Sequence, residues 1–181
     1  MKYVVLLRGV NVGGNHKVPK GELKAVLEGQ GFQNVTTYIN SGNALFESDT
    51  TPHANEIQAA LESHFGFTIP TLVLSEGKLR TIAAAIPDEW TNDTPKPDKS
   101  GQKSDVLFLF DAVNTPEIIE QLGHKPEIET MLYIDGAVIT NITRANQSKG
   151  SLQKIIGTKV YADVTIRNIT TVKKLAELIG K

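Results

Sequence analysis

The sequence predicts an α+β protein built from two similar halves, each with the element order βαββαβα. Short apolar runs rich in β-branched residues alternate with stretches of helical spacing. A segment rich in proline and polar residues, 89–103, interrupts the pattern, which then begins again. Each half also carries a hairpin signal between its second and third strands, at Asn40–Asn43 and at Asp135–Gly136.

In the first half, the apolar run Val4–Leu7 predicts a buried strand, and a glycine-rich loop follows from Gly9 to Lys17. Pro19 favours the first turn of a helix, because that turn does not need its N–H. Helical spacing and glycine stops extend this helix to about Gly29. The same signals predict the remaining elements: strands at Val35–Ile39 and Ala44–Phe46, a helix between Pro52 and Gly66, a strand at Ile69–Leu74 and a helix from Ser75 to Ile86.

The second half repeats this order after segment 89–103, which we expect to be a linker between subdomains 1–88 and 104–181. Its predicted elements are a strand at Val106–Phe110, a short helix from Asn114 or Thr115 to Leu122, strands at Met131–Ile134 and Val138–Asn141, a helix at about Lys149–Ile156, a strand at Val160–Ile166 and a helix at Thr170–Ile179. The repeated order suggests an internal duplication, and βαββαβ is the order of the ferredoxin-like fold. The hairpins argue against one doubly wound parallel sheet.

The composition excludes several kinds of catalytic and metal-binding site. The 181 residues include no cysteine, which excludes a disulfide framework, a thiol nucleophile and Cys-based metal sites. The four histidines lack the spacing of metal ligands, so we expect no metal and no cofactor. The apolar run at the N-terminus is too short for a signal peptide, and no segment is long enough to span a membrane. We therefore expect a cytoplasmic protein without a membrane partner.

Charge is distributed unevenly along the chain. The net charge is −1, yet residues 140–181 contain eight Lys or Arg residues against two acidic ones, an excess of six positive charges. Such an excess attracts anionic ligands such as a phosphate-bearing small molecule or a nucleic acid. The alternative is a solvated basic face that is balanced by acids folded nearby.

The loop between the first strand and the first helix is one candidate anion site. Its glycines allow backbone N–H groups to face a ligand at a helix N-terminus, and its cations can contact phosphate. The loop has neither the Gly-Lys-Ser/Thr ending of a Walker loop nor the dinucleotide-binding pattern. The alternative is a long turn that needs glycine for its backbone angles. The candidate ligand-binding residues here are Arg8, Asn11, Gly13, Gly14 and Lys17.

Three further segments carry polar candidates. Ser41 and Asn43 could offer hydroxyl and amide groups to a ligand, but a simple turn is the favoured interpretation, because Asn and Gly are the residues that turns select. Ser148-Lys149 and Arg167-Asn168 lie at two predicted helix starts, where Ser148 and Asn168 could simply be N-caps. A cation is unfavourable at a helix start, and a bound anion would remove this conflict.

Several of these motifs resemble those of a bacterial family, domain of unknown function 1697. The resemblance rests on Leu6–Gly14, Lys17-Val18-Pro19, Tyr38–Asn43, Ser148-Lys149 and Arg167-Asn168. It covers nearly the whole chain and implies a cytoplasmic protein with two ferredoxin-like subdomains, with no accepted activity. Three positions depart from the family pattern: Ile169 replaces a usual Trp, Thr170 a usual Asn and Asn40 a common Gln. If that Trp stacks on a ligand, this chain lacks the contact.

Three functions remain open. The first is binding of a phosphate-bearing ligand by the polar loops, with or without catalysis. The second is a protein-interaction or self-associating module in which the loops are only turns. The third is hydrolysis of acyl phosphates by Arg8 and Asn40, which rests on an analogy between folds.

Overall fold

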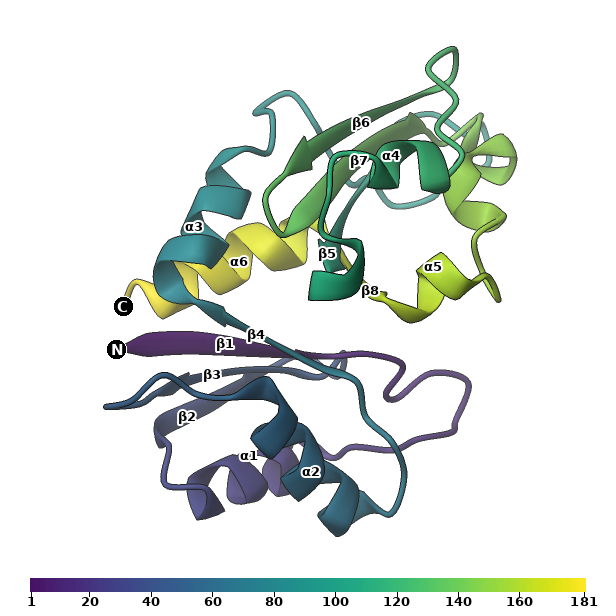
Figure 1. Ribbon diagram of the computed structural model, residues 1–181. Coiled ribbons are helices and arrows are strands. Elements are labelled where there is room, and N and C mark those ends of the chain that lie inside the picture. Colours follow the sequence, from purple (N-terminus) through teal and green to yellow (C-terminus); the bar gives the residue numbers. More distant parts are fainter. The chain divides into compact units, whose positions relative to one another are not determined.

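The computed structural model describes all residues from 1 to 181 (Figure 1). It shows a mixed α/β fold with two four-stranded antiparallel sheets and six α-helices, together with three short 3₁₀-helices. The chain divides into two compact units. The first contains residues 1–80 and 175–181, and the second contains residues 81–174.

The first unit contains a sheet with the strand order β2-β3-β1-β4, in which every neighbouring pair is antiparallel. Its strands are β1 (Lys2–Leu7), β2 (Gln33–Tyr38), β3 (Asn43–Glu47) and β4 (Thr71–Ser75). Helices α1 (Lys20–Gly29) and α2 (Ala54–Phe65) cover one face of this sheet (Figure 1). On that face, alternate residues of β1 pack against the apolar sides of both helices: Tyr3, Val5 and Leu7 against Leu23, Leu27, Ile57 and Leu61.

The elements predicted for the first half are confirmed. α2 ends at Gly66, which adopts the left-handed conformation that glycine tolerates. β4 is an edge strand, which fits the position of Pro70 immediately before it. Helix α3 (Glu76–Ala84) begins at a cap, because the Ser75 hydroxyl accepts a hydrogen bond from the Lys78 N–H at 3.2 Å.

The second unit contains a sheet with the equivalent order β6-β7-β5-β8, again antiparallel throughout. Its strands are β5 (Gln102–Leu109), β6 (Glu129–Ile134), β7 (Ala137–Thr143) and β8 (Val164–Asn168). The other elements that begin in this unit are η1 (Asp111–Val113), α4 (Ile118–Gln121), η2 (Gln147–Lys149), η3 (Ser151–Gln153), α5 (Lys159–Ala162) and α6 (Ile169–Ile179). The predicted hairpin at Asp135–Gly136 joins β6 to β7.

Two predictions for the second half are wrong. Residues 149–156 do not form one helix, because Gly150 has an extended backbone (ψ 159°) and separates η2 from η3. The predicted strand at Val160–Ile166 begins only at Val164. Thr158 explains the difference, since its hydroxyl accepts a hydrogen bond from the Tyr161 N–H at 3.3 Å and starts α5 instead. A local cap here outweighs the β-propensity of Val160.

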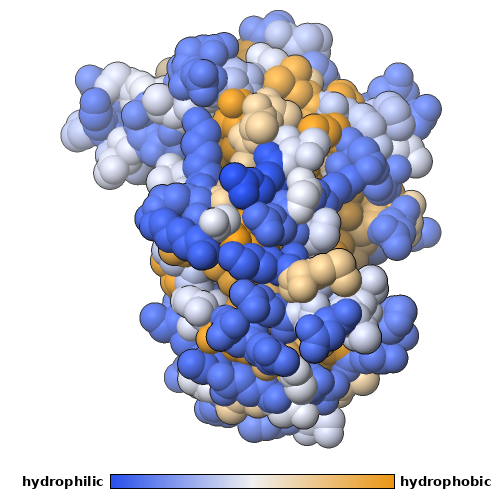
Figure 2. Space-filling model, turned by 90° about the vertical axis from the view of Figure 1, so that its left-hand side faces the viewer, coloured by the Kyte–Doolittle hydropathy of each residue, from blue (hydrophilic) through white to orange (hydrophobic).

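Few large apolar side chains are exposed. They are Met1, Val12, Ile39, Leu132 and Ile156. On the face drawn in Figure 2, hydrophilic residues separate the apolar areas from one another. None of the helices combines the length and the apolar character that crossing a membrane requires.

Candidate functional site

The glycine-rich loop after β1 is held in shape by Asn11. Asn11, Gly13, Gly14 and His16 all have positive φ angles, between 50° and 80°. The Asn11 side-chain amide donates to the carbonyl oxygens of Val18 (3.1 Å) and Asn40 (2.9 Å). Its oxygen accepts from the Val18 N–H at 2.8 Å. These bonds close the loop and fasten it to the turn between β2 and β3.

A cavity of about 430 Å³ lies where this loop, the start of α1 and the β2–β3 turn meet. Its lining residues are Asn11, Gly14, Lys17, Val18, Pro19, Lys20 and Asn40. They include two cations and no carboxylate. No side chain caps α1, so the first N–H groups of that helix lack a side-chain acceptor. The lining is therefore electropositive and rich in hydrogen-bond donors.

The structure brings together only some of the loop residues predicted to bind a ligand. Asn11, Gly14 and Lys17 line the cavity, whereas Arg8 and Gly13 are not part of its lining. The Asn43 side chain is fully buried, and its amide donates to the Tyr38 carbonyl (3.1 Å) and to the Ser41 hydroxyl (2.8 Å). Ser41 and Asn43 therefore build the turn.

Of the two basic helix starts predicted for the second unit, only the one at Arg167-Asn168 lies next to an α-helix, because α6 begins at Ile169. Lys149 closes the short η2 and does not begin a helix, so the expected conflict with a helix dipole does not arise. Arg167 lies inside β8, and its guanidinium donates to the Thr165 hydroxyl (3.0 Å) and the Ile166 carbonyl (2.9 Å). Burial lowers the pKa of Arg167 to about 10.

Asn168 and the residue after it have structural roles. The Asn168 side-chain oxygen accepts from the Thr171 N–H at 2.8 Å and caps α6. Ile169, which stands where the family usually has Trp, is 2% exposed and belongs to the apolar interior. In this chain, position 169 therefore contributes packing.

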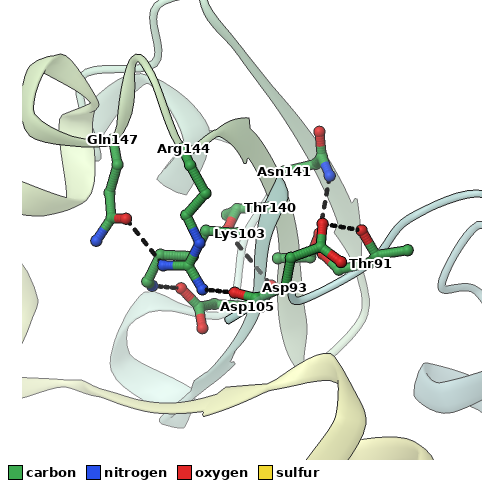
Figure 3. A network of polar contacts seen from close by, with 9 residues as sticks. Thr91, Asp93, Lys103, Asp105, Thr140, Asn141, Arg144 and Gln147 are labelled. Carbon is green, nitrogen blue, oxygen red and sulfur yellow. Dashed lines mark hydrogen bonds and ion pairs between the residues drawn. The ribbon is translucent and has the colours of Figure 1, made fainter. Parts of the chain in front are cut away.

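The second unit also contains a polar network that the sequence patterns do not predict (Figure 3). Arg144 follows β7, and its guanidinium donates to the Gln147 side-chain oxygen (2.9 Å) and to the Asp93 carbonyl. The Asp93 carboxylate accepts from the Gln102 N–H (2.7 Å) and from the Thr91 hydroxyl (2.8 Å). Segment 89–103, expected to be a linker, is thus fastened to the sheet that it precedes. No local pattern signals this network, because Arg144 and the Asp93 carbonyl that it binds are 51 residues apart in sequence.

We expect the Asp93 carboxyl to titrate below its ordinary pKa of 3.8. The Gln102 N–H and the Thr91 hydroxyl favour its charged form. Since the pKa is lower in the folded state, this stabilisation is present above the unfolded-state pKa and is lost as the pH falls through the folded-state value. A ¹³C NMR titration of the carboxyl measures the shift. Thr91→Val should raise the pKa towards 3.8, and an unchanged value in that variant would contradict the assignment.

Comparison with known proteins places the chain in a family. Residues 1–140 match the family described as a protein of unknown function, DUF1697. The solved structure of a conserved bacterial protein from Streptococcus pneumoniae is 25% identical, with a TM-score of 0.77 over 98% of each chain. No curated protein matches the chain. The motifs noted in the sequence, the family match and the shared fold agree, and the chain belongs to the DUF1697 family of proteins of unknown function.

Proposed function

We propose that this protein binds a phosphate-bearing ligand in the cavity beside the glycine-rich loop. The observation that carries the proposal is the meeting of Lys17, Lys20 and the uncapped start of α1 around one cavity without a carboxylate in its lining. Helix N-termini favour anions, because their free N–H groups point at the ligand and the helix dipole adds partial positive charge. The side chain of Asn40 can supply a directional contact at the same place, while the Asn11 amide is used in holding the loop.

The loop is also prepared for binding before a ligand arrives. Asn11 fixes both ends of the loop by its three hydrogen bonds. A loop that is already ordered loses less conformational entropy when it binds. Lys17 and Lys20 are exposed, so their ammonium groups can reach a phosphate without breaking an existing structure.

Replacing both lysines should weaken phosphate binding. We expect Lys17→Ala/Lys20→Ala to lower the affinity by roughly tenfold or more, because charge-assisted hydrogen bonds contribute about 1.5–3 kcal/mol each and 1.4 kcal/mol is about tenfold. Calorimetric titration with inorganic phosphate, AMP and a five-nucleotide single-stranded DNA measures the affinity and separates small ligands from nucleic acid.

Lys24→Ala is the matched control for this experiment. Lys24 is exposed on the same helix, lies outside the cavity and pairs with Glu28 at 3.7 Å. The control variant should bind as the unchanged protein does. Equal affinities for the double variant and the control, or no binding of any of the three probes to the unchanged protein, would refute the proposed function.

A protein-interaction or self-associating module is the second candidate function. Val12 and Ile39 favour it, since their side chains are 68% and 43% exposed in the loop and in the β2–β3 turn. Two isolated side chains are a small apolar area for a stable interface. Hydrolysis of acyl phosphates by Arg8 and Asn40 has less support, because Asn40 lines the cavity and Arg8 does not.

We infer that the two sheets arose by duplication of one ferredoxin-like unit. The orders β2-β3-β1-β4 and β6-β7-β5-β8 are equivalent position by position, and both sheets are antiparallel throughout. In the first unit, a helix follows the first strand and another follows the third, as βαββαβ requires. On this proposal, 1–88 and 104–181 are the duplicated subdomains, and only the first kept a long loop after its first strand.

A further inference from the structure

A second cavity, of about 290 Å³, lies within the second unit. From the segment before β5 it is lined by Pro95, Lys96 and Lys99, and from the segment after β7 by residues that include Arg144 and Gln147. Three cations line it, Lys96, Lys99 and Arg144, together with the polar side chains of Gln147 and Ser148. The lining contains no carboxylate. This cavity involves none of the residues of the glycine-rich loop.

Arg144 is held in place by neutral groups. Two of its nitrogens donate to the Gln147 side chain and to the Asp93 carbonyl, and no carboxylate lies within 4.0 Å to form an ion pair. Its third nitrogen, Nε, is buried and has no hydrogen-bond partner. A buried donor without an acceptor destabilises the fold by about 1–3 kcal/mol. Nε itself is closed to solvent, so a ligand in the cavity would contact Arg144 through the remaining N–H groups of its two terminal nitrogens.

Asp93, an acid of the polar network, does not neutralise these cations fully. The Asp93 carboxylate interacts electrostatically with Lys96 and Arg144. However, it accepts hydrogen bonds from the Gln102 N–H and the Thr91 hydroxyl, which direct it towards the start of β5. The positive charge of the cavity is therefore available to an anion.

We propose that this cavity is a second ligand site, which binds a small molecule through a diphosphate or polyphosphate group. Three cations in one small cavity suit a compact group with several negative charges. The volume is near the lower end of ligand pockets, which begin at roughly 300 Å³. No aromatic side chain lines the cavity, so it offers a nucleobase no surface for stacking.

Titration with inorganic pyrophosphate tests the site. ¹⁵N NMR follows the Nε–H signal of Arg144, which has no partner in the free protein. We expect this signal to shift and saturate, and to be absent in Arg144→Lys. Lys96→Ala/Lys99→Ala should weaken binding by roughly tenfold or more while the protein stays folded, because both side chains are exposed.

Control variants separate this site from the loop cavity and from general charge effects. Lys154→Ala removes an exposed cation of the same unit that does not line the cavity, and it should leave the Arg144 signal response unchanged. Lys17→Ala/Lys20→Ala should also leave it unchanged, so that failure of one site is distinguishable from failure of the other. The proposal would be overturned if the Arg144 signal did not shift during the titration. It would also be overturned if Lys96→Ala/Lys99→Ala bound pyrophosphate as tightly as the unchanged protein.

Two further probes identify the ligand class. ATP and inorganic tripolyphosphate should bind with similar affinity, because the cavity recognises the phosphates and not the base. A single-stranded oligonucleotide should displace pyrophosphate only weakly. If the oligonucleotide displaced pyrophosphate at a lower concentration than tripolyphosphate does, the preferred ligand would be a nucleic acid. That result would reject the inference.

Discussion

Gly42→Ala should destabilise the protein by about 3 kcal/mol, since both a backbone and a packing penalty apply. Gly42 has a φ of +70°, a conformation that residues with a side chain rarely adopt. A Cβ at this position would lie 2.6 Å from Val10 Cγ2 and 2.8 Å from Leu7 Cβ. Both neighbours are buried and have no room to move. The Gly42 carbonyl also accepts from the Leu7 N–H at 2.8 Å, so a displaced turn would lose that bond.

Gly31→Ala is the control that carries the backbone penalty without the steric one, so the difference between the two variants measures the steric part. Gly31 belongs to the same unit and has a φ of +88°, but a Cβ there would meet no atom within 4 Å. We expect this control to cost about 1 kcal/mol, from the backbone conformation alone. Equilibrium denaturation in guanidinium chloride compares the two variants. Equal losses of stability would show that contact with Leu7 and Val10 is unimportant.

The effect of Gly42 extends to the proposed ligand cavity. Asn40, which lines the cavity, lies two residues before Gly42 in the same turn, and the Asn11 amide bonds to its carbonyl. A shift of the turn would therefore loosen the loop that Lys17 belongs to. Gly42→Ala should weaken phosphate binding as well as folding, whereas Gly31→Ala should affect folding alone.

The parts of the fold that were predicted correctly depend on local chemistry. The run Val4–Leu7 is apolar and β-branched, which favours a buried strand wherever it lies in the chain. Gly66 ends α2 and Gly136 forms a two-residue hairpin, because each adopts a positive φ that its neighbours could not. Such signals need no knowledge of the rest of the molecule.

The failed predictions depend on contacts between distant segments. Residues 149–156 have helical spacing, but Gly150 lies against Ile142 and Glu129, so the chain there is extended. Arg144 was not recognised as a site residue, because the Asp93 carbonyl that holds it is 51 residues away in sequence. A pattern of residues along the chain does not reveal such pairs.

At the candidate site, too, some features follow from local sequence and others from contacts between distant segments. The sequence favoured a turn at Asn43 over ligand binding, and its complete burial with bonds to Tyr38 and Ser41 supports the turn. The place of Lys17 between glycines and a helix predicts a ligand contact, and Lys17 does line a cavity. The residue types indicated which segments are polar and could bind a ligand. Whether each side chain lines a cavity or builds a turn depends on tertiary contacts.

Glu129→Ala should destabilise the second unit by about 3–4 kcal/mol. Glu129 is 7% exposed, and its carboxylate accepts from the backbone N–H groups of Lys125 (3.0 Å) and Ser151 (3.1 Å). Alanine would leave two N–H groups without an acceptor, at about 1–3 kcal/mol each. Relief of the desolvated charge offsets part of this loss. Guanidinium denaturation measures the difference, and faster hydrogen exchange at Ser151 would locate it.

Glu127→Ala is the matched control, because Glu127 is an exposed carboxylate two residues earlier that lies outside this network. Its replacement should change stability by less than about 0.5 kcal/mol. The comparison also tests why glycine occupies position 150, where a Cβ would lie 3.1 Å from the Glu129 carboxylate and 2.8 Å from Ile142. If the carboxylate organises this turn, Glu129→Ala should also disturb the neighbouring cavity at Arg144 and weaken pyrophosphate binding. Equal stability of the two variants would mean that the turn holds its shape without Glu129.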